Sequence, residues 1–460
     1  METIEQKQNW KQNLWYILCS LILVWPALNN MFPLVTPDTG TYIHSGLALS
    51  MPTDRPWGYG IFLLLSSMAI SPWFPIFWQG FFCTWLIIEL GKKCLGNQRP
   101  KTFWIGIIIV IAFGTSSAWV NSEIMADAFT GLLLIAILLL YTQPETRRER
   151  NKLNAFIVFC LFTHHSHLFI TFLLSIGLYF YFSKKRLVYE MRVSIKLMLY
   201  TVIVALVIST ANFIGHYGFG LSPSSHLFLM SRMAENGILD EYLKEECPID
   251  SNILCNYQGK TGARQWDFMW ASEGLPHTRE NGWETMRDPY RKIIFKTLIK
   301  PKFLGMHIVK NSEAGIKQLA QLQFLNGFDQ DFHAGSSLHN TISKEFPTYI
   351  KEFETDKQNQ HVLPLTAFDF IIQICSIIII LLGVLSHSYN HEKGDDDSRF
   401  LWKKLFFIAI GFIVINAFVT ATFSTVIGRL QARVFWVLPL ICLLYFAKMI
   451  LNYRETKKYN

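Results

Sequence analysis

The chain has 460 residues, of which 51% are hydrophobic and only 17% are charged. Soluble domains carry about 25% charged residues, so this composition excludes an ordinary soluble protein and indicates a membrane protein. The net charge of +8 does not indicate nucleic-acid binding, because most of the surplus lies in short loops between apolar runs. We therefore expect membrane lipids, and no nucleic acid, among the partners.

The first apolar run begins near Leu14, after a polar start, and no small-residue cleavage site follows it. We expect it to be a permanent transmembrane helix and not a cleaved signal peptide. A helix needs roughly 20 apolar residues to cross a bilayer. The clearest runs of this kind are Leu14–Phe32, Phe74–Leu90, Phe103–Val120, Ala128–Tyr141, Leu197–Ile214, Leu365–Leu385, Leu405–Thr425 and Val434–Leu451.

One further run, Ala155–Phe182, is too long for a single crossing and carries His164 and His165 near its middle. Basic clusters flank both of its ends, which places both ends in the cytoplasm by the positive-inside rule. The pattern favours a tight helical hairpin with the histidines at its outer tip. The alternative is one long tilted helix, which would place a basic cluster outside.

The sequence thus predicts an all-α polytopic membrane protein with about ten transmembrane helices. Both termini are expected in the cytoplasm, and a bacterial inner membrane is the expected location. The distribution of Lys and Arg among the short loops carries this topology. The basic residues of the inner loops are Lys92, Lys93, Arg99 and Lys101; Arg147, Arg148, Arg150 and Lys152; Lys184, Lys185 and Arg186; Lys393, Arg399, Lys403 and Lys404; and Arg454, Lys457 and Lys458.

Two outer segments separate the helices. Residues 33–72 hold a polar stretch and then a short apolar stretch, Tyr59–Ile70, which is typical of a helix lying along the membrane surface. Residues 215–362 have mixed charge and many turn residues, as expected of a large extracytoplasmic domain. The expected division is a membrane bundle in residues 1–214, the outer domain in 215–362, and three further helices in 363–460. The inner loop 391–398 is expected to be a solvated linker.

Cys247 and Cys255 are the two cysteines of the large outer domain, whereas the other six lie in or beside apolar runs. An oxidising compartment favours their pairing, so we expect a disulfide. Half of a metal site is the alternative, but no second cysteine pair or His-x-His accompanies them.

Candidate chemistry gathers at the predicted outer ends of several helices, where charged groups are costly unless they serve a function. Asp38 follows the first helix, and Glu123 and Asp127 lie at i, i+4 spacing between two later helices. Taken singly, each has a structural explanation: a turn or helix cap for the acids, core packing for the histidines, and interfacial snorkelling for the arginines. Their gathering favours a functional site with these members: Asp38, Arg55, Glu123, Asp127, His164, His165, Arg429 and Arg433.

This pattern resembles the GT-C superfamily, the integral-membrane glycosyltransferases that use polyprenyl-phosphate sugars. These include the protein O-mannosyltransferases and the lipid A aminoarabinose transferase. The resemblance rests on Pro37, Asp38, Thr39 and Tyr42 after the first helix, on Arg55–Pro56, on Glu123 or Asp127, and on the large late outer domain. It covers roughly the first 180 residues and the last helices. The sequence departs from several members in having one acid, not a pair, after the first helix.

The resemblance implies an inverting transfer of sugar from a polyprenyl-phosphate donor to an extracytoplasmic acceptor. Asp38 would take the proton of the acceptor hydroxyl, or would orient the base that does so. Arg429 or Arg433, with Arg55, would bind the donor phosphate. Glu123, Asp127 and the histidines would hold the acceptor, or a divalent cation together with Asp38; no other cofactor is implied.

Three other functions remain open from the sequence. A lipid-linked glycan polymerase also combines a long outer loop with arginines. A transporter would need charges at mid-membrane, for which Asp369 is the main candidate. A non-catalytic membrane scaffold would need neither set of acids.

Overall fold

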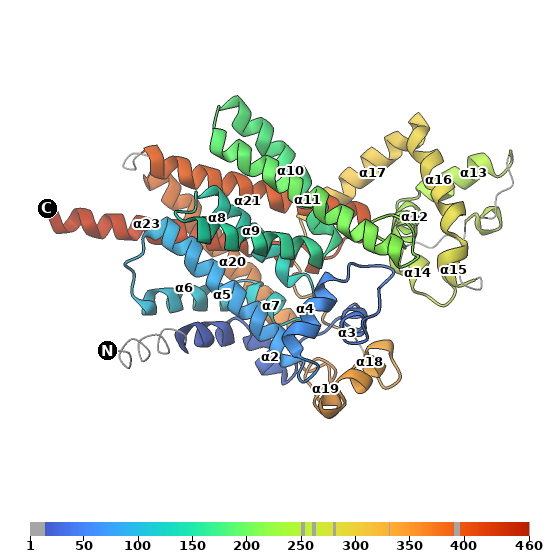
Figure 1. The fold of residues 1–460 in the computed structure, drawn as a ribbon, viewed down its shortest axis with the longest axis horizontal. Coiled ribbons are helices and arrows are strands. Elements are labelled where there is room, and N and C mark those ends of the chain that lie inside the picture. Colours follow the sequence, from blue (N-terminus) through green and yellow to red (C-terminus); the bar gives the residue numbers. More distant parts are fainter. Residues whose placement is uncertain are drawn as a thin grey trace.

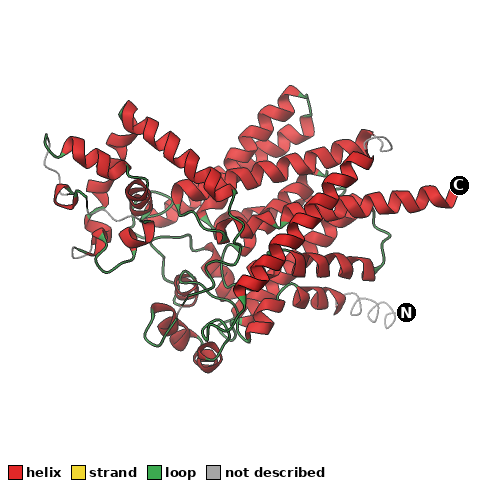
Figure 2. Ribbon diagram, turned by 180° about the vertical axis from the view of Figure 1, so that it is seen from behind, coloured by secondary structure: helices red, strands yellow, loops and turns green. Residues whose placement is uncertain are grey.

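The computed structural model describes residues 14–249, 254–259, 264–278, 282–330, 332–390 and 396–459, and these are α-helices joined by loops (Figure 2). Residues 1–13 and most of the predicted linker 391–398 lie outside the described residues. Six helical segments of the described chain are long and apolar enough to cross a membrane. They are α5 (Trp73–Leu95), α10 (His165–Lys184), α11 (Val188–Ile214), α20 (Leu365–Asn390), α21 (Asp396–Phe423), and α22 (Arg429–Phe435) continued by α23 (Val437–Tyr459).

The protein is therefore an all-helical, multi-pass membrane-type chain, and the count of ten crossings stays a prediction. Two runs that were expected to cross form short helices: α6 (Lys101–Gly114) and α8 (Ala128–Tyr141) have 14 residues each. At 1.5 Å per residue each spans about 21 Å, less than the roughly 30 Å of a hydrocarbon core. The third run breaks after Gly114, where the hydroxyls of Thr115 and Ser117 bind the carbonyl of Ile111, and α7 (Ser117–Asn121) follows.

The long apolar run folds as two helices that meet at one residue. α9 (Arg147–Thr163) ends and α10 begins on either side of His164, which is extended. The far end of α10 returns to the end of α8, where the ring of Phe182 lies 5.6 Å from that of Tyr141. α9 starts only six residues after Tyr141, so both ends of the run lie together. The chain therefore turns back at the histidines, as the hairpin prediction required.

The first helix and the segment after it are short pieces. Residues 14–22 are helical, and α2 (Trp25–Asn30) continues them after a turn. α3 (Thr39–Leu47) and α4 (Gly58–Ser67) then pack against each other, with the backbones of Gly46 and Gly60 in close approach. α4 is the short apolar helix that was expected to lie along the membrane surface.

The described residues between 215 and 320 project from one end of the bundle, opposite the C-terminal end of α23, and those between 332 and 362 pack at the same end (Figure 1). We call this the distal end. The helices of this region are α12 (Ser225–Glu235), α13 (Ile238–Glu246), α14 (Gln265–Met269), α15 (Gly282–Thr285), α16 (Arg287–Ile299), α17 (Pro301–Leu319), α18 (Ser337–Glu345) and α19 (Ile350–Glu354), with short 3₁₀ turns at Cys255–Tyr257, Leu275–His277 and Pro347–Tyr349.

This region divides into two parts with different cores. Residues from α12 to the start of α17 share a small apolar core of their own that includes Leu239 and Tyr290. Residues of α18 and α19 instead join the main core of the bundle, as Leu338 and Phe353 do. The predicted disulfide between Cys247 and Cys255 is confirmed, and it joins the end of α13 to the following 3₁₀ turn.

Candidate functional site

The backbone brings the segment after α2 beside the link between α7 and α8. The amide of Leu34 donates to the carbonyl of Ser122 at 2.9 Å, and the amide of Ile124 donates to the carbonyl of Leu34 at 3.0 Å. These two bonds form an isolated parallel bridge between Leu34 and Glu123. Asp38 and Glu123, 85 positions apart in the sequence, are therefore carried by paired segments.

Two buried glutamines fix these segments in place. The amide nitrogen of Gln79, on α5, donates to the carbonyls of Asn121 and Glu123 at 3.0 and 2.9 Å. Gln358, which follows α19, binds both backbone groups of Val35, three residues before Asp38. Each amide satisfies backbone groups that would otherwise be buried without a partner. The membrane helix α5 thus holds the segment that carries Glu123, and the distal region holds the loop that carries Asp38.

Asp38 lies between two guanidinium groups. Its Oδ1 is 3.0 Å from Nη2 of Arg55, and its Oδ2 is 3.2 Å from Nη2 of Arg429. Arg55 also pairs with Asp54 at 2.7 Å. Asp38 is the N-cap residue of α3, yet its side chain makes no capping hydrogen bond. The helix-cap explanation therefore does not account for this carboxylate, which is committed to the arginines.

Arg429 joins Asp38 to the second pair of predicted acids. Its Nη1 lies 3.4 Å from Oε1 of Glu123, and its Nε lies 4.0 Å from Oδ2 of Asp127. The amide nitrogen of Arg429 donates to the side chain of Asn326 at 3.2 Å, which fixes the start of α22. One arginine at the distal end of a late helix thus contacts acids from two early segments.

A fully buried ion pair lies beneath this arginine. Arg433, one turn after Arg429, places Nη1 2.7 Å from Oδ1 of Asp127. It also donates to Oδ1 of Asn416 at 2.8 and 3.2 Å and to Oγ of Ser166 at 3.0 Å. The hydroxyl of Ser166 in turn contacts Nδ1 of His164 at 2.8 Å.

Exposure decreases along this set from Asp38 inward. The side chain of Asp38 is 31% exposed and that of Arg429 is 15% exposed, whereas those of Glu123 and Arg433 are each 1% exposed. A molecule approaching from the distal end would meet Asp38 and Arg429 first. Glu123, Asp127 and Arg433 lie behind them.

The arginines and the burial move the pKa values of two acids in opposite directions. Burial alone would raise the pKa of Asp38, but the charges of Arg55 and Arg429 outweigh it and lower this pKa to about 2. Burial raises the pKa of Glu123 to about 8, because Arg429 offsets it only in part and neighbouring carboxylates add to it. The pKa of Asp38 therefore lies far below neutral pH, whereas that of Glu123 is shifted upward.

The predicted histidines are near this set but do not join the acids. Within the described ranges, no hydrogen bond or ion pair links His164 or His165 to Asp38, Glu123 or Asp127. The side chain of His164 caps the start of α10, where its Nδ1 accepts a hydrogen bond from the amide of Ser166 at 3.1 Å. The described part of the chain holds no group of three or more His, Cys, Asp or Glu residues arranged for a metal ion. The divalent cation stays a prediction.

Sequence reasoning missed the neutral partners of the charges. Asn416 and Gln79 are completely buried inside the long apolar helices α21 and α5. A lone amide in an apolar run is costly in a membrane, and this was a signal that could have marked both residues. Gln358 and Asn326 gave no comparable signal, because they lie among other polar residues.

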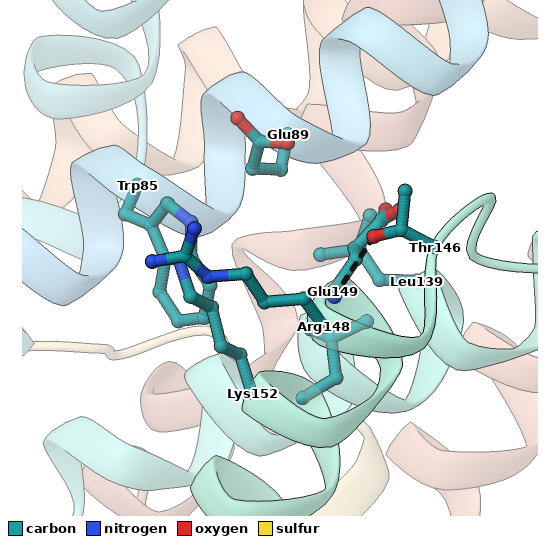
Figure 3. Close-up of a pocket in the computed structure, with 8 residues that line it drawn as sticks. Trp85, Glu89, Leu139, Thr146, Arg148, Glu149 and Lys152 are labelled. Atoms are coloured by element: carbon teal, nitrogen blue, oxygen red, sulfur yellow. Dashed lines mark hydrogen bonds between the residues drawn. The ribbon is translucent and has the colours of Figure 1, made fainter.

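A cavity of about 300 Å³ lies elsewhere, between α5, α8 and the start of α9 (Figure 3). Arg148 and Lys152 reach toward Trp85 there. Leu139, which also lines it, is eleven residues along α8 from the end that carries Asp127, or about 17 Å. This cavity is therefore at the opposite end of the bundle from the charged set.

Comparisons of the chain with models of protein families, with curated proteins and with solved structures gave no match. A functional assignment consequently depends on the chemistry of the charged set itself.

Proposed function

We propose that the chain is a membrane glycosyltransferase of the GT-C type, which transfers a sugar from a polyprenyl-phosphate donor to an extracytoplasmic acceptor. The observation that carries the proposal is the position of Asp38 between Arg55 and Arg429 at the distal end of the bundle. A partly exposed carboxylate beside two arginines provides a base for a hydroxyl group and cations for a phosphate.

Asp38 is the proposed general base. In the transfer, the acceptor oxygen bonds to the anomeric carbon while its proton passes to the carboxylate of Asp38. The bond from the anomeric carbon to the phosphate oxygen breaks, and its electron pair stays on the lipid phosphate. The lipid phosphate is a good leaving group, so the reaction depends more on fixed positive charge near the phosphate than on a general acid.

Arg429 is the proposed phosphate-binding residue. It is partly exposed, and its nearest partners are Asp38 and Glu123 at 3.2 and 3.4 Å. A donor phosphate would compete with Asp38 for this guanidinium. Because Arg429 helps to hold the pKa of Asp38 at about 2, its engagement with phosphate would raise that pKa. Asp38 would then become a stronger base only when the donor is bound.

Arg433 is better suited to a structural role than to phosphate binding. It is 1% exposed and already bonded to Asp127, Asn416 and Ser166. Glu123 and Asp127 would orient the two arginines, with Glu123 also available to an acceptor hydroxyl. Of the two arginines of α22, the proposal therefore assigns the donor to Arg429.

The test is binding of undecaprenyl phosphate, the lipid product expected for such a donor, to the purified protein in nanodiscs by native mass spectrometry. A hydrogen bond to a charged group contributes about 1.5–3 kcal/mol, so Arg429→Gln should weaken binding by about 10- to 150-fold. Arg264→Gln is the matched control, because Arg264 is an exposed, ion-paired arginine of the distal region. Equal binding by the wild type and Arg429→Gln would refute the assignment.

The position of Asp369 argues against the transporter alternative. It lies in the second turn of α20, where its Oδ1 accepts hydrogen bonds from the amides of Phe324 and Leu325 at 2.8 and 3.3 Å. Such a carboxylate fixes a loop at a helix end. A lipid-linked glycan polymerase would use the same arginines, and stronger binding of undecaprenyl diphosphate than of the monophosphate would favour it.

A further inference from the structure

The helix α17 runs outward from the bundle, and α16 meets it at its outer end (Figure 1). Both helices expose apolar side chains. On α17, Ile308 and Ile316 are 62% and 63% exposed, and on α16, Phe295 is 63% exposed. Spacings of three, four and eight residues place such side chains on one face of a helix. We define the α16–α17 apolar face as Phe295, Leu298, Ile299, Leu304, Ile308, Val309 and Ile316, all of which are exposed.

The last turns of α17 lie beside a candidate membrane span. A Cβ on Gly315 would come within 2.6 Å of the ring of Phe418, so the backbone of α17 touches α21 there. Phe418 precedes the end of α21 by five residues, or about 7.5 Å. Amphipathic helices bury their apolar face about 5–10 Å into the boundary between headgroups and acyl chains. With the end of α21 taken as the edge of the membrane, this part of α17 lies within that range of depth.

The joint between α17 and the membrane bundle is specific. The side chain of Gln318 donates to the carbonyl of Ile427 and accepts from its amide, both at 2.9 Å. Ile427 lies in the turn between α21 and α22. Two hydrogen bonds to one backbone unit fix the direction in which α17 leaves the bundle.

The charge of the two helices fits a lipid surface. Residues 287–319 contain eight Lys or Arg and two Asp or Glu, a difference of +6. Four of the lysines pair with nearby acids: Lys296, Lys300 and Lys302 with Glu241, Glu245 and Glu246 of α13, and Lys310 with Glu313. The exposed Arg291, Lys292 and Lys317 carry the positive charge that is left for a lipid surface. Lys and Arg side chains can place their stems along apolar surface and their charges among phosphate headgroups. A second copy of the chain would bring an equally basic surface to the same face, and like charges would oppose that contact.

We propose that α16 and α17 form an interfacial helix pair, with the α16–α17 apolar face in the leaflet at the distal end and the basic residues among its anionic headgroups. This inference does not depend on the glycosyltransferase proposal. It uses only the contact of α17 with α21, the exposure of the apolar face, and the charge of the segment.

The consequence for the molecule is a lipid-anchored support next to Arg429. The same stretch that ends α17 holds the turn before α22, and Asn326 binds the amide of Arg429. A helix pair embedded in the leaflet would fix the height of that arginine relative to the headgroups.

The experiment uses the full-length variants Ile308→Cys and Phe295→Cys. Each is placed in nanodiscs that hold one copy of the protein, so that a second copy cannot cover the apolar face. Lys244→Cys is the control, because Lys244 is exposed on α13 in the same distal region. Labelling by a membrane-impermeant maleimide is measured after subtraction of the wild-type background, since five of the six native free cysteines are buried and Cys375 is partly buried. We expect Ile308→Cys and Phe295→Cys to react at least tenfold more slowly than Lys244→Cys.

A second measurement separates lipid from protein as the cover. The Ile308→Cys and Phe295→Cys proteins are labelled in detergent with an environment-sensitive fluorophore and returned to nanodiscs containing doxyl-labelled lipid. Quenching at both positions, with none at Lys244→Cys, supports the proposal. Labelling at the control rate, or protection without quenching, would overturn it.

Discussion

Asp38→Asn separates the proposed base from a structural residue. The substitution keeps the size of the side chain and one accepting oxygen, which can serve Arg55 or Arg429, but it removes the charge and places an NH2 group against the other arginine. General bases contribute typically 10²- to 10⁴-fold to a rate, so turnover should fall by about that factor. Folding should be unaffected, because the side chain makes no capping bond to α3 and asparagine is as good a turn former as aspartate.

Asp38→Asn should bind the lipid phosphate at least as tightly as the wild type, although its turnover falls. Without the negative charge of Asp38, Arg429 keeps Glu123, whose pKa is raised by burial, and a contact to Asp127 at 4.0 Å. A phosphate then meets less competition, so undecaprenyl phosphate should bind as tightly as to the wild type or more tightly.

The assay follows release of undecaprenyl phosphate from a panel of undecaprenyl-phosphate sugars in proteoliposomes, with product binding measured on the same preparations. Loss of turnover with retained binding is the expected result. Retained turnover would refute the base assignment and transfer it to Glu123. Joint loss of binding and turnover would show that Asp38 only supports the fold.

Three further predictions concern the buried charges and the topology. Arg433→Gln should cost about 3–5 kcal/mol of stability by leaving Asp127 unpaired, and Arg433→Gln with Asp127→Asn should recover much of it; additive losses in thermal unfolding would contradict the pairing. Burial raises the pKa of Glu123 from its ordinary 4.5 to about 8. As pH rises, the unfolded chain therefore releases this proton at a lower pH than the folded protein does. The wild type should lose stability relative to Glu123→Gln between about pH 4.5 and about pH 8. A flat difference in melting temperature over that range would show that Glu123 is ionised in the folded protein. Reporter fusions after Lys185 and near Gly259 should report opposite sides of the membrane, and the same side for both would exclude the ten-helix topology.

The sequence predicted the elements whose signals are local. The break at His164 followed from the length of an apolar run and the basic residues at its ends. The disulfide followed from the isolation of Cys247 and Cys255. The first signal lay within about 40 residues and the second within one predicted domain, so no tertiary contact was needed to find either.

The remaining features depend on contacts between distant segments. An apolar run shows that a helix is compatible with a membrane, but it does not show that Thr115 and Ser117 will bind Ile111 and end α6 early. Backbone groups make the bridge between Leu34 and Glu123 and receive the hydrogen bonds between Gln358 and Val35. A pattern of side chains in the sequence does not predict such contacts. The acids and arginines were named as one candidate set, but the pairing of Arg429 with Asp38 and of Arg433 with Asp127 required the fold.

The complete enclosure of α8 has a consequence for the biogenesis of the protein. All 14 of its residues are buried, and it contacts α5, α9, α21 and α22. Because α8 is apolar on every side, contact with lipid is not costly for it while the helices that enclose it are still being synthesised. The carboxylate of Asp127, at the start of α8, has no ion-pair partner at that stage, because Arg433 is synthesised only with the last membrane segment. The final helix therefore neutralises a charge left by one of the first, and a chain truncated before α22 would display an unpaired carboxylate to the membrane quality-control machinery.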